Sequence, residues 1–340
     1  MINNTSDNIL LSVCLVTYNH DFFIKKVLDS VISQETDFRF ELVIGEDCST
    51  DKTRSICEEY QHLYPNIVNL LPPTRNLGLK ENFLRTFSVC RGKYIAYLEG
   101  DDYWISNKKI QKQVDLLETY SGISLVHTNC HIWDTNNDLI IKSVIPTEGI
   151  CIREQQYGLS SIIAEFEGNF RGIKTSSCVY RKDTLETILK EDEYAFRCEE
   201  FPMQDFQLFL EMSMKGKFAF IPEPMTMIGL HDSLSAAKNE KNRISYNLGF
   251  YRAGIYYIKK HQLPKRTIQI WVRRQLNYMF NIGFKNKDKK LVENVKRLAD
   301  SVNYTIPLTQ RLLYLGTKST FFRLLLYPFW KLLTIYRNQN

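Results

Sequence analysis

The chain has 340 residues, of which 44% are hydrophobic and 24% charged, so it is long and apolar enough to bury a large core and is not a disordered polypeptide. Its formal charge of +6 suits an anionic substrate or an anionic membrane surface. The sequence carries no signature of a nucleic-acid-binding module, and none of its 8 cysteines pairs at the CxxC spacing of a zinc site.

The first hundred residues alternate between strand and helix patterns. Apolar, β-favouring runs predict strands at 10–16, 40–45, 67–71 and 93–98. Apolar side chains at helical spacing predict helices at 22–33, 51–60 and 80–90 between them. Parallel strands that are joined through helices require right-handed crossovers. The pattern therefore predicts an α/β domain with a mostly parallel sheet flanked by helices.

Polar side chains follow three of these strands at the point where each strand ends. Thr17 and Asn19 follow the first strand, Asp47 follows the second, and an acidic cluster follows the fourth. Because ligands of open parallel sheets bind outside the carboxyl ends of the strands, these residues predict one shared site. Neither a GxGxxG nor a GxxxxGK[ST] motif is present, which argues against a dinucleotide site and against a P-loop.

The acidic cluster consists of Glu99, Asp101 and Asp102, and Gly100 is expected to let the backbone turn sharply between them. Carboxylate oxygens are the ligands that hard divalent cations prefer, and such cations often carry diphosphates. These residues therefore indicate a cation site. A solvated acidic turn after a buried strand gives the same local pattern.

The middle of the chain continues the domain. A helix is predicted at 108–120, a strand at 123–127 and a hairpin around residues 136–137. A strand at 175–181 is expected to reach the same site, and helices are expected at 185–190 and 201–214. The final strand, at 217–221, is expected to end where Pro222 and Pro224 force a turn.

Beyond residue 236 the sequence is rich in aromatic and basic residues, with predicted helices at 246–261 and 267–280. A strongly apolar stretch at 321–336 is interrupted by Arg323, Pro328 and Lys331, so it is too short and too charged to span a bilayer. It is expected either to pack as a core helix or to lie at a membrane interface.

Residues 10–235 resemble the family 2 glycosyltransferases, which have the nucleotide-diphospho-sugar transferase fold called GT-A. The resemblance rests on motifs that follow the family's order: SVCLVTYN at 12–19, EDCSTD at 46–51, NLG at 76–78, EGDD at 99–102, QD at 204–205, and His231 with Ser233 and Ser235. It implies a GT-A domain at 10–235. The helical region at 236–340 would then serve acceptor binding, oligomer formation or membrane association.

The resemblance implies roles for the strand-end residues. Asp47 is expected to accept a hydrogen bond from the base, most simply from N3–H of uracil, although it also fits a helix cap beside Ser49. Asp101 is the expected ligand of Mg²⁺ or Mn²⁺, and His231 is expected to bind this metal, to contact the diphosphate or to be structural. Glu99 stands where the family's metal motif has aspartate, so its longer side chain is expected to reach the ribose or a metal-bound water. The residues expected to line the nucleotide and donor are Thr17, Tyr18, Asn19, Asp47, Asn76, Lys80, Glu99 and Asp102.

Asp205 matches the family's catalytic base, although it also fits a stabilising position at a helix N-terminus. Gln204 precedes it where the family has an acidic residue, and this missing charge predicts a lower pKa for the base than in relatives. The implied reaction is direct displacement, in which Asp205 takes the proton of an acceptor hydroxyl while its oxygen attacks the anomeric carbon of a UDP-sugar. The configuration inverts, and the acceptor is expected to be a glycan or a lipid-linked saccharide.

Two other interpretations stay open. The chain fits a non-catalytic, membrane-associated glycan-assembly protein that has kept the fold, and release of nucleoside diphosphate separates this interpretation from the enzyme. A nucleotidyltransferase of the same fold is less favoured, because residues 17–20 lack the glycine-rich loop. Residues 1–8 show no signal-peptide pattern, so the expected location is the cytoplasm or the inner face of the cell membrane. A homo-oligomer is compatible with the sequence.

Overall fold

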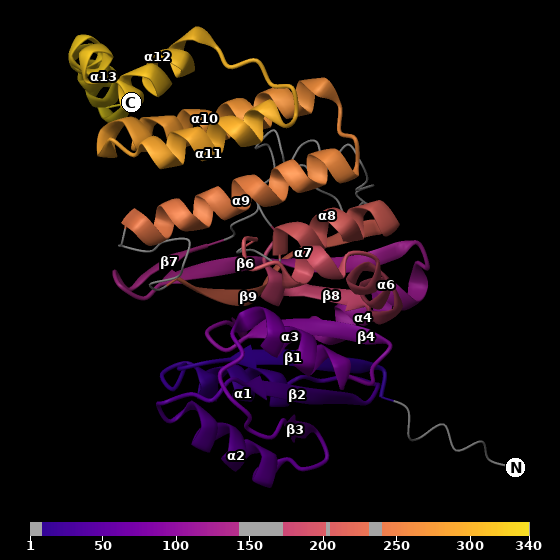
Figure 1. The fold of residues 1–340 in the computed structure, drawn as a ribbon. Coiled ribbons are helices and arrows are strands. Elements are labelled where there is room, and N and C mark those ends of the chain that lie inside the picture. The colour runs from indigo at the N-terminus through magenta and orange to yellow at the C-terminus, as the bar shows by residue number, and fades with distance from the viewer. Residues whose placement is uncertain (1–8, 143–172, 202–204, 231–239, 340) are drawn as a thin grey trace, which may run out of the picture. The chain divides into compact units, whose positions relative to one another are not determined.

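The computed structural model describes residues 9–142, 173–201, 205–230 and 240–339 (Figure 1). These residues form two compact units. Unit 1 contains the described residues 9–142, 173–198 and 205–230, and unit 2 contains 199–201 and 240–339. The boundary that the sequence predicts between 235 and 236 lies outside the described residues and stays a prediction.

The first half of unit 1 alternates between strands and helices, and each element predicted before residue 100 is present. The elements are β1 (Leu11–Thr17), α1 (Ile24–Ile32), β2 (Phe40–Glu46), α2 (Thr53–Leu63), β3 (Val68–Leu70), α3 (Leu79–Ser88) and β4 (Tyr94–Glu99). β1 is parallel to both β2 and β4, and β2 is parallel to β3. Every residue of β1 is buried, as expected of a central strand in such a sheet.

The second half of unit 1 extends this sheet beyond β4. Its elements are β5 (Tyr103–Trp104), α4 (Lys109–Thr119), β6 (Ile123–Asp134), β7 (Leu139–Ile141), the 3₁₀ turn η1 (Thr175–Ser177), β8 (Cys178–Arg181), α6 (Lys182–Glu191), α7 (Glu193–Arg197), α8 (Asp205–Lys215) and β9 (Lys217–Leu230). The strand order is β3-β2-β1-β4-β8-β6-β9-β5, with β7 paired to β6 (Figure 1). Because β8 is antiparallel to both β4 and β6, these two strands run in the same direction, and β9 is parallel to β6. The mostly parallel sheet predicted from the sequence is confirmed.

Details of this second half differ from the prediction. β9 does not end at Pro222 but continues past Pro224, because its register against β6 shifts there and the prolines need not donate to the ladder. Residues 175–177 form η1 instead of the start of a strand. β5 and α7 are not among the predicted elements. The predicted hairpin around residues 136–137 is the β6–β7 hairpin.

The main apolar core of unit 1 lies between the sheet and helices α1, α2 and α4. Buried residues from each of these elements contribute to it, among them Leu15, Leu28, Ile44, Cys57, Ile110 and Val114. This core fixes the strands that carry the polar residues at their carboxyl ends.

In its described residues from 240 onward, unit 2 consists of helices joined by short connections. Its helices are α9 (Glu240–Lys260), α10 (Lys265–Asn286), α11 (Lys289–Asp300), α12 (Leu308–Lys318) and α13 (Thr320–Gln339). The sequence analysis predicts α9, α10 and α13 but neither α11 nor α12. α9 and α10 approach closely, since a Cβ on Gly254 would lie only 2.0 Å from the ring of Trp271. Among the described helices, none combines the length and the apolar character that crossing a membrane requires.

Candidate active site

The carboxyl ends of β1, β2 and β4 lie at one edge of the sheet. The N–H of Asp47 donates to the carbonyl oxygen of Thr17 at 3.0 Å, and the N–H of Gly100 donates to that of Val16 at 2.9 Å. The parallel register of the three strands therefore brings the predicted strand-end residues together.

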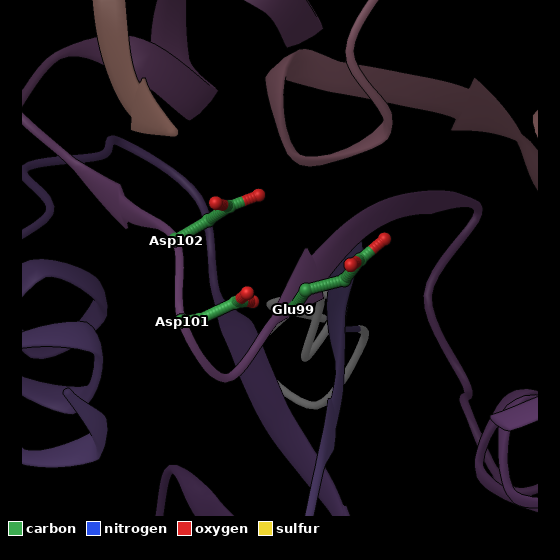
Figure 2. Close-up of side chains that lie close together, drawn as sticks. All are labelled: Glu99, Asp101 and Asp102. Atoms are coloured by element: carbon green, nitrogen blue, oxygen red, sulfur yellow. The ribbon is translucent and has the colours of Figure 1, made fainter. Parts of the chain in front are cut away.

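Glu99, Asp101 and Asp102 are close enough to share one cation. One carboxylate oxygen of each residue lies within 4.8 Å of those of the other two. Glu99 ends β4, whereas Asp101 and Asp102 belong to the loop that leads to β5, and the three side chains extend toward the same side in Figure 2. This acidic cluster is the group that the sequence predicts.

Hydrogen bonds from η1 and β9 hold the cluster in place. Oγ1 of Thr175 donates to Oε1 of Glu99 at 3.1 Å, and the N–H of Glu99 donates to Oγ of Ser176 at 3.2 Å. The N–H of Gly229 donates to Oδ1 of Asp102 at 2.9 Å. Glu99 is thus held by η1 and Asp102 by β9. These hydrogen bonds keep the carboxylate oxygens close together despite the repulsion between their negative charges.

Gly100 has a different role from the predicted one. Its φ is not in the left-handed region, so the turn itself does not require glycine. The limited space at residue 100 does require glycine, because a Cβ at this position would lie 2.3 Å from Oγ1 of Thr17 and 2.5 Å from Nδ1 of His20. A side chain at residue 100 would push the acidic loop away from the end of β1.

Burial and mutual repulsion raise the pKa values of the cluster. Burial is the main cause that raises the pKa of Glu99 to about 7, and the charge of Asp101 adds to it. Burial also raises the pKa of Asp102 well above its usual range, and the charges of Asp101 and Glu99 add again. A bound cation offsets such repulsion, since an opposite charge favours the ionised form. Three carboxylates in a partly buried loop therefore fit a hard divalent cation.

Asp205 is the first residue of α8, and the N–H of Phe206 donates to its Oδ1 at 2.7 Å. Burial raises the pKa of Asp205, against the opposing effects of this hydrogen bond and of the charge of Lys174. The charge of Asp205 contributes to the raised pKa of Glu99, so the two carboxylates interact. Gln204 lies outside the described residues, and the pKa of Asp205 relative to that in relatives stays a prediction.

Asp47 is buried and holds the loop that precedes α3. Its Oδ1 accepts from the N–H of Leu77 at 2.7 Å and its Oδ2 from the N–H of Gly78 at 2.8 Å, while Nδ2 of Asn76 donates to the Asp47 carbonyl oxygen at 3.1 Å. A carboxylate oxygen has more than one acceptor position, so Asp47 keeps capacity for a base. Its bonds to this loop give Asp47 a structural role that the sequence analysis does not contain.

The other residues that are predicted to line the nucleotide differ in their contacts and in their exposure to solvent. Asn19, with a φ of 55°, accepts at Oδ1 from the N–H of Thr50 at 2.9 Å and so joins the loops after β1 and β2. Tyr18 beside it is exposed. Lys80 on α3 donates from Nζ to the carbonyl oxygen of Cys198 at 2.5 Å, which directs it to the end of α7. His231 lies outside the described residues.

The model of Glycosyl transferase family 2 matches residues 12–188, from β1 to α6, and includes the acidic cluster. The chain belongs to this family. The resemblance stated from the sequence motifs is thereby confirmed.

Relatives of this family 2 chain include an uncharacterised protein of Mycobacterium tuberculosis, which is 37% identical over 221 residues. The aligned part is 65% of this chain and 59% of that protein, so the chain spans less than two thirds of the relative's length.

Two solved structures share the fold. Residues 1–349 of S. aureus TarS in complex with UDP-GlcNAc have a TM-score of 0.52 at 16% identity, over 91% of this chain and 79% of that TarS fragment. The mannosyltransferase PcManGT from Pyrobaculum calidifontis, in complex with GDP-Man and Mn²⁺, has a TM-score of 0.52 at 14% identity, over 97% of this chain and 84% of PcManGT. The predicted GT-A fold is confirmed by these structures.

The sequence does not predict Gly229 as a residue of the candidate site. Gly229 binds Asp102 across a separation of 127 residues, from the part of β9 that the prolines were expected to exclude from the sheet. A single glycine in a strand gives no local signal of this contact, and only the pairing of β9 reveals it.

Proposed function

We propose that this family 2 chain transfers a sugar from a nucleotide-diphosphate donor, a UDP-sugar in the simplest case, to a hydroxyl group of a glycan or lipid-linked acceptor. The reaction inverts the anomeric configuration and depends on Mg²⁺ or Mn²⁺. The observation that carries the proposal is the close grouping of Glu99, Asp101 and Asp102.

The acidic cluster provides the cation site of the proposal. Asp101 is the expected direct ligand, and Asp102 completes the site or orients the acceptor. Glu99, held by Thr175, reaches toward the ribose. When bound, the cation offsets the negative charge that develops on the departing diphosphate.

Asp205 is the proposed general base. Its carboxylate accepts the proton of the acceptor hydroxyl while the acceptor oxygen forms a bond to the anomeric carbon. The bond from that carbon to the diphosphate oxygen breaks, and its electron pair leaves with the nucleoside diphosphate. Because burial raises the pKa of Asp205, the carboxylate binds a proton more readily than an exposed aspartate does. A single displacement inverts the configuration.

The proposed donor class is compatible with the ligands of the two structural relatives. TarS binds UDP-GlcNAc and PcManGT binds GDP-Man with Mn²⁺, so their donors differ in base and sugar but share a diphosphate. A cation on the acidic cluster is suited to this shared part. The choice of UDP rests on Asp47, whose remaining acceptor capacity suits the N3–H of uracil.

A donor panel tests the proposal. The purified full chain is incubated with UDP-, GDP- and dTDP-sugars, Mn²⁺ and a saccharide acceptor mixture, and released nucleoside diphosphate is measured. We expect release from at least one donor, with loss of release in Asp205→Asn and in excess chelator. If no donor in the panel is cleaved while the chain is folded, the alternative of a non-catalytic glycan-assembly protein is favoured.

A further inference from the structure

The charge of the chain is divided sharply along the sequence. Residues 234–340 contain 21 Lys and Arg but only 4 Asp and Glu, a formal charge of +17, whereas the whole chain carries +6. The last acidic residue is Asp300, so α12 and α13 carry none. Such asymmetry is typical of a region that meets a polyanion or an anionic surface.

α13 presents a row of large apolar side chains to solvent. Phe321, Leu324, Leu325 and Phe329, here called the outer stripe, recur at helical spacing and are 68%, 73%, 56% and 69% exposed. On α12, Leu308 is also exposed. A contiguous exposed group of this size is uncommon on a monomeric protein and marks an interaction surface.

The orientation of α13 is fixed by its other face, which packs within unit 2. Arg323 donates from Nη1 to the carbonyl oxygen of Phe284 and lies 4.7 Å from the centre of its ring. Nε1 of Trp330 donates to Oδ1 of Asn281 at 2.8 Å. The inner face of α13 therefore packs on α10. The outer stripe is not the face through which α13 packs in unit 2.

We propose that the outer stripe of α13 inserts into the interface of an anionic lipid bilayer while the basic residues of unit 2 contact its head groups. Apolar side chains are stabilised by leaving water, and the excess of lysine and arginine in unit 2 attracts the negatively charged lipid surface. The surface lies outside the site of the proposed function and does not depend on that function.

Two other occupants fit less well. A nucleic acid would be attracted by the positive charge, but its phosphate backbone gains nothing from contact with four exposed apolar side chains. A second copy of the chain would cover the stripe, but it would bring two strongly positive units together, which costs electrostatic free energy. A bilayer with anionic lipids satisfies both features at once.

Vesicle co-sedimentation of the full chain tests the proposal. The vesicles contain either phosphatidylcholine alone or a mixture with phosphatidylglycerol. The stripe variant is Leu324→Glu/Leu325→Glu. The matched control is Leu63→Glu/Leu139→Glu, which changes two leucines of 57% and 55% exposure in unit 1 and alters the net charge equally.

We expect the wild type and the control to sediment with anionic vesicles and not with phosphatidylcholine alone, and the stripe variant to bind at least about tenfold more weakly. High salt should release the wild-type chain from the anionic vesicles, and this test requires no variant. Circular dichroism and thermal unfolding verify that both variants are folded.

Any one of four results would overturn the inference. The wild type stays in the supernatant with anionic vesicles, or the stripe variant binds them as well as the control. Alternatively, ultracentrifugation detects a wild-type dimer that the stripe variant loses, or a labelled RNA binds more tightly than the vesicles do. None of these measurements involves a sugar donor, so they do not bear on the proposed function.

Discussion

The backbone N–H of Gly229 donates a hydrogen bond of 2.9 Å to Oδ1 of Asp102, and this bond joins β9 to the acidic loop. The approach is so close that a Cβ on Gly229 would lie 2.6 Å from the carbonyl oxygen of Asp101. Backbone packing against β9 thus positions two of the three carboxylates, and glycine at this position is needed for space.

A methyl group at this contact should disturb the site. In Gly229→Ala either β9 or the acidic loop must shift, so we expect turnover to fall at least about tenfold in a chain that still folds. Gly122→Ala is the matched control, because a Cβ there meets no atom within 4 Å. Steady-state kinetics and thermal unfolding of both variants check this. Equal turnover in the two variants would show that the contact does not position the carboxylates.

Asp205→Asn tests the base separately from binding. The amide is nearly isosteric but does not take up a proton in the reaction, so turnover should fall by at least about a hundredfold. Donor affinity, measured by calorimetry, should stay close to that of the wild type. Loss of donor binding would instead make Asp205 a binding or structural residue.

Asp47→Asn tests the loop that precedes α3. Its two carboxylate oxygens accept from Leu77 and Gly78, and an amide replaces one of these acceptors with a donor. We expect the KM for the donor to rise about tenfold with a smaller change in kcat, since uniform binding is lost. Asp183→Asn, an exposed aspartate on α6, controls for the lost charge. An unchanged KM would contradict the role of this loop in donor binding.

The sequence predicts the first half of unit 1 well because its signals are local. Apolar runs and helical spacing mark β1, β2 and β4 with the helices between them, and the carboxyl-end rule then brings Thr17, Asp47 and the acidic cluster together. The reason for Gly100 is different, because it depends on Thr17 and His20, whose positions relative to residue 100 follow only from the packed structure.

Most elements that the sequence does not predict depend on partners that are distant along the chain. β9 passes Pro222 and Pro224 because β6 shifts its register opposite them. β5 has only two residues and is defined by its pairing with β9. α11 is different, since buried Leu291, Val295 and Ala299 recur at helical spacing and form a pattern that was available in the sequence.

Lys109 should make stability depend on pH. It is fully buried on α4, where its Nζ donates to Oε1 of Gln113 at 2.7 Å and lies 4.6 Å from the centre of the Trp104 ring. Burial lowers its pKa to about 7. Between that value and about 10.4, its value when unfolded, the unfolded chain binds more protons, so the contribution of Lys109 to stability rises with pH.

Lys109→Met removes this titration. The difference in unfolding free energy between wild type and variant should change in favour of the wild type as pH rises from about 7 to about 10, by at most ~1.4 kcal/mol per pH unit. Denaturant unfolding across this range measures it, and Lys112→Met, at an exposed position of α4, is the control. A difference that stays constant with pH would mean that Lys109 keeps an ordinary pKa.

The central claim is that the acidic cluster binds a divalent cation together with the donor diphosphate. The most direct measurement is calorimetric binding of UDP and GDP to the full chain, with Mn²⁺ or with chelator, for wild type, Asp101→Ala and the exposed-aspartate control Asp115→Ala. We expect Mn²⁺-dependent binding in the wild type and the control, and binding weakened at least about tenfold in Asp101→Ala or with chelator, with transfer abolished in both cases. Full binding and full transfer in excess chelator, or in Asp101→Ala, would contradict the account.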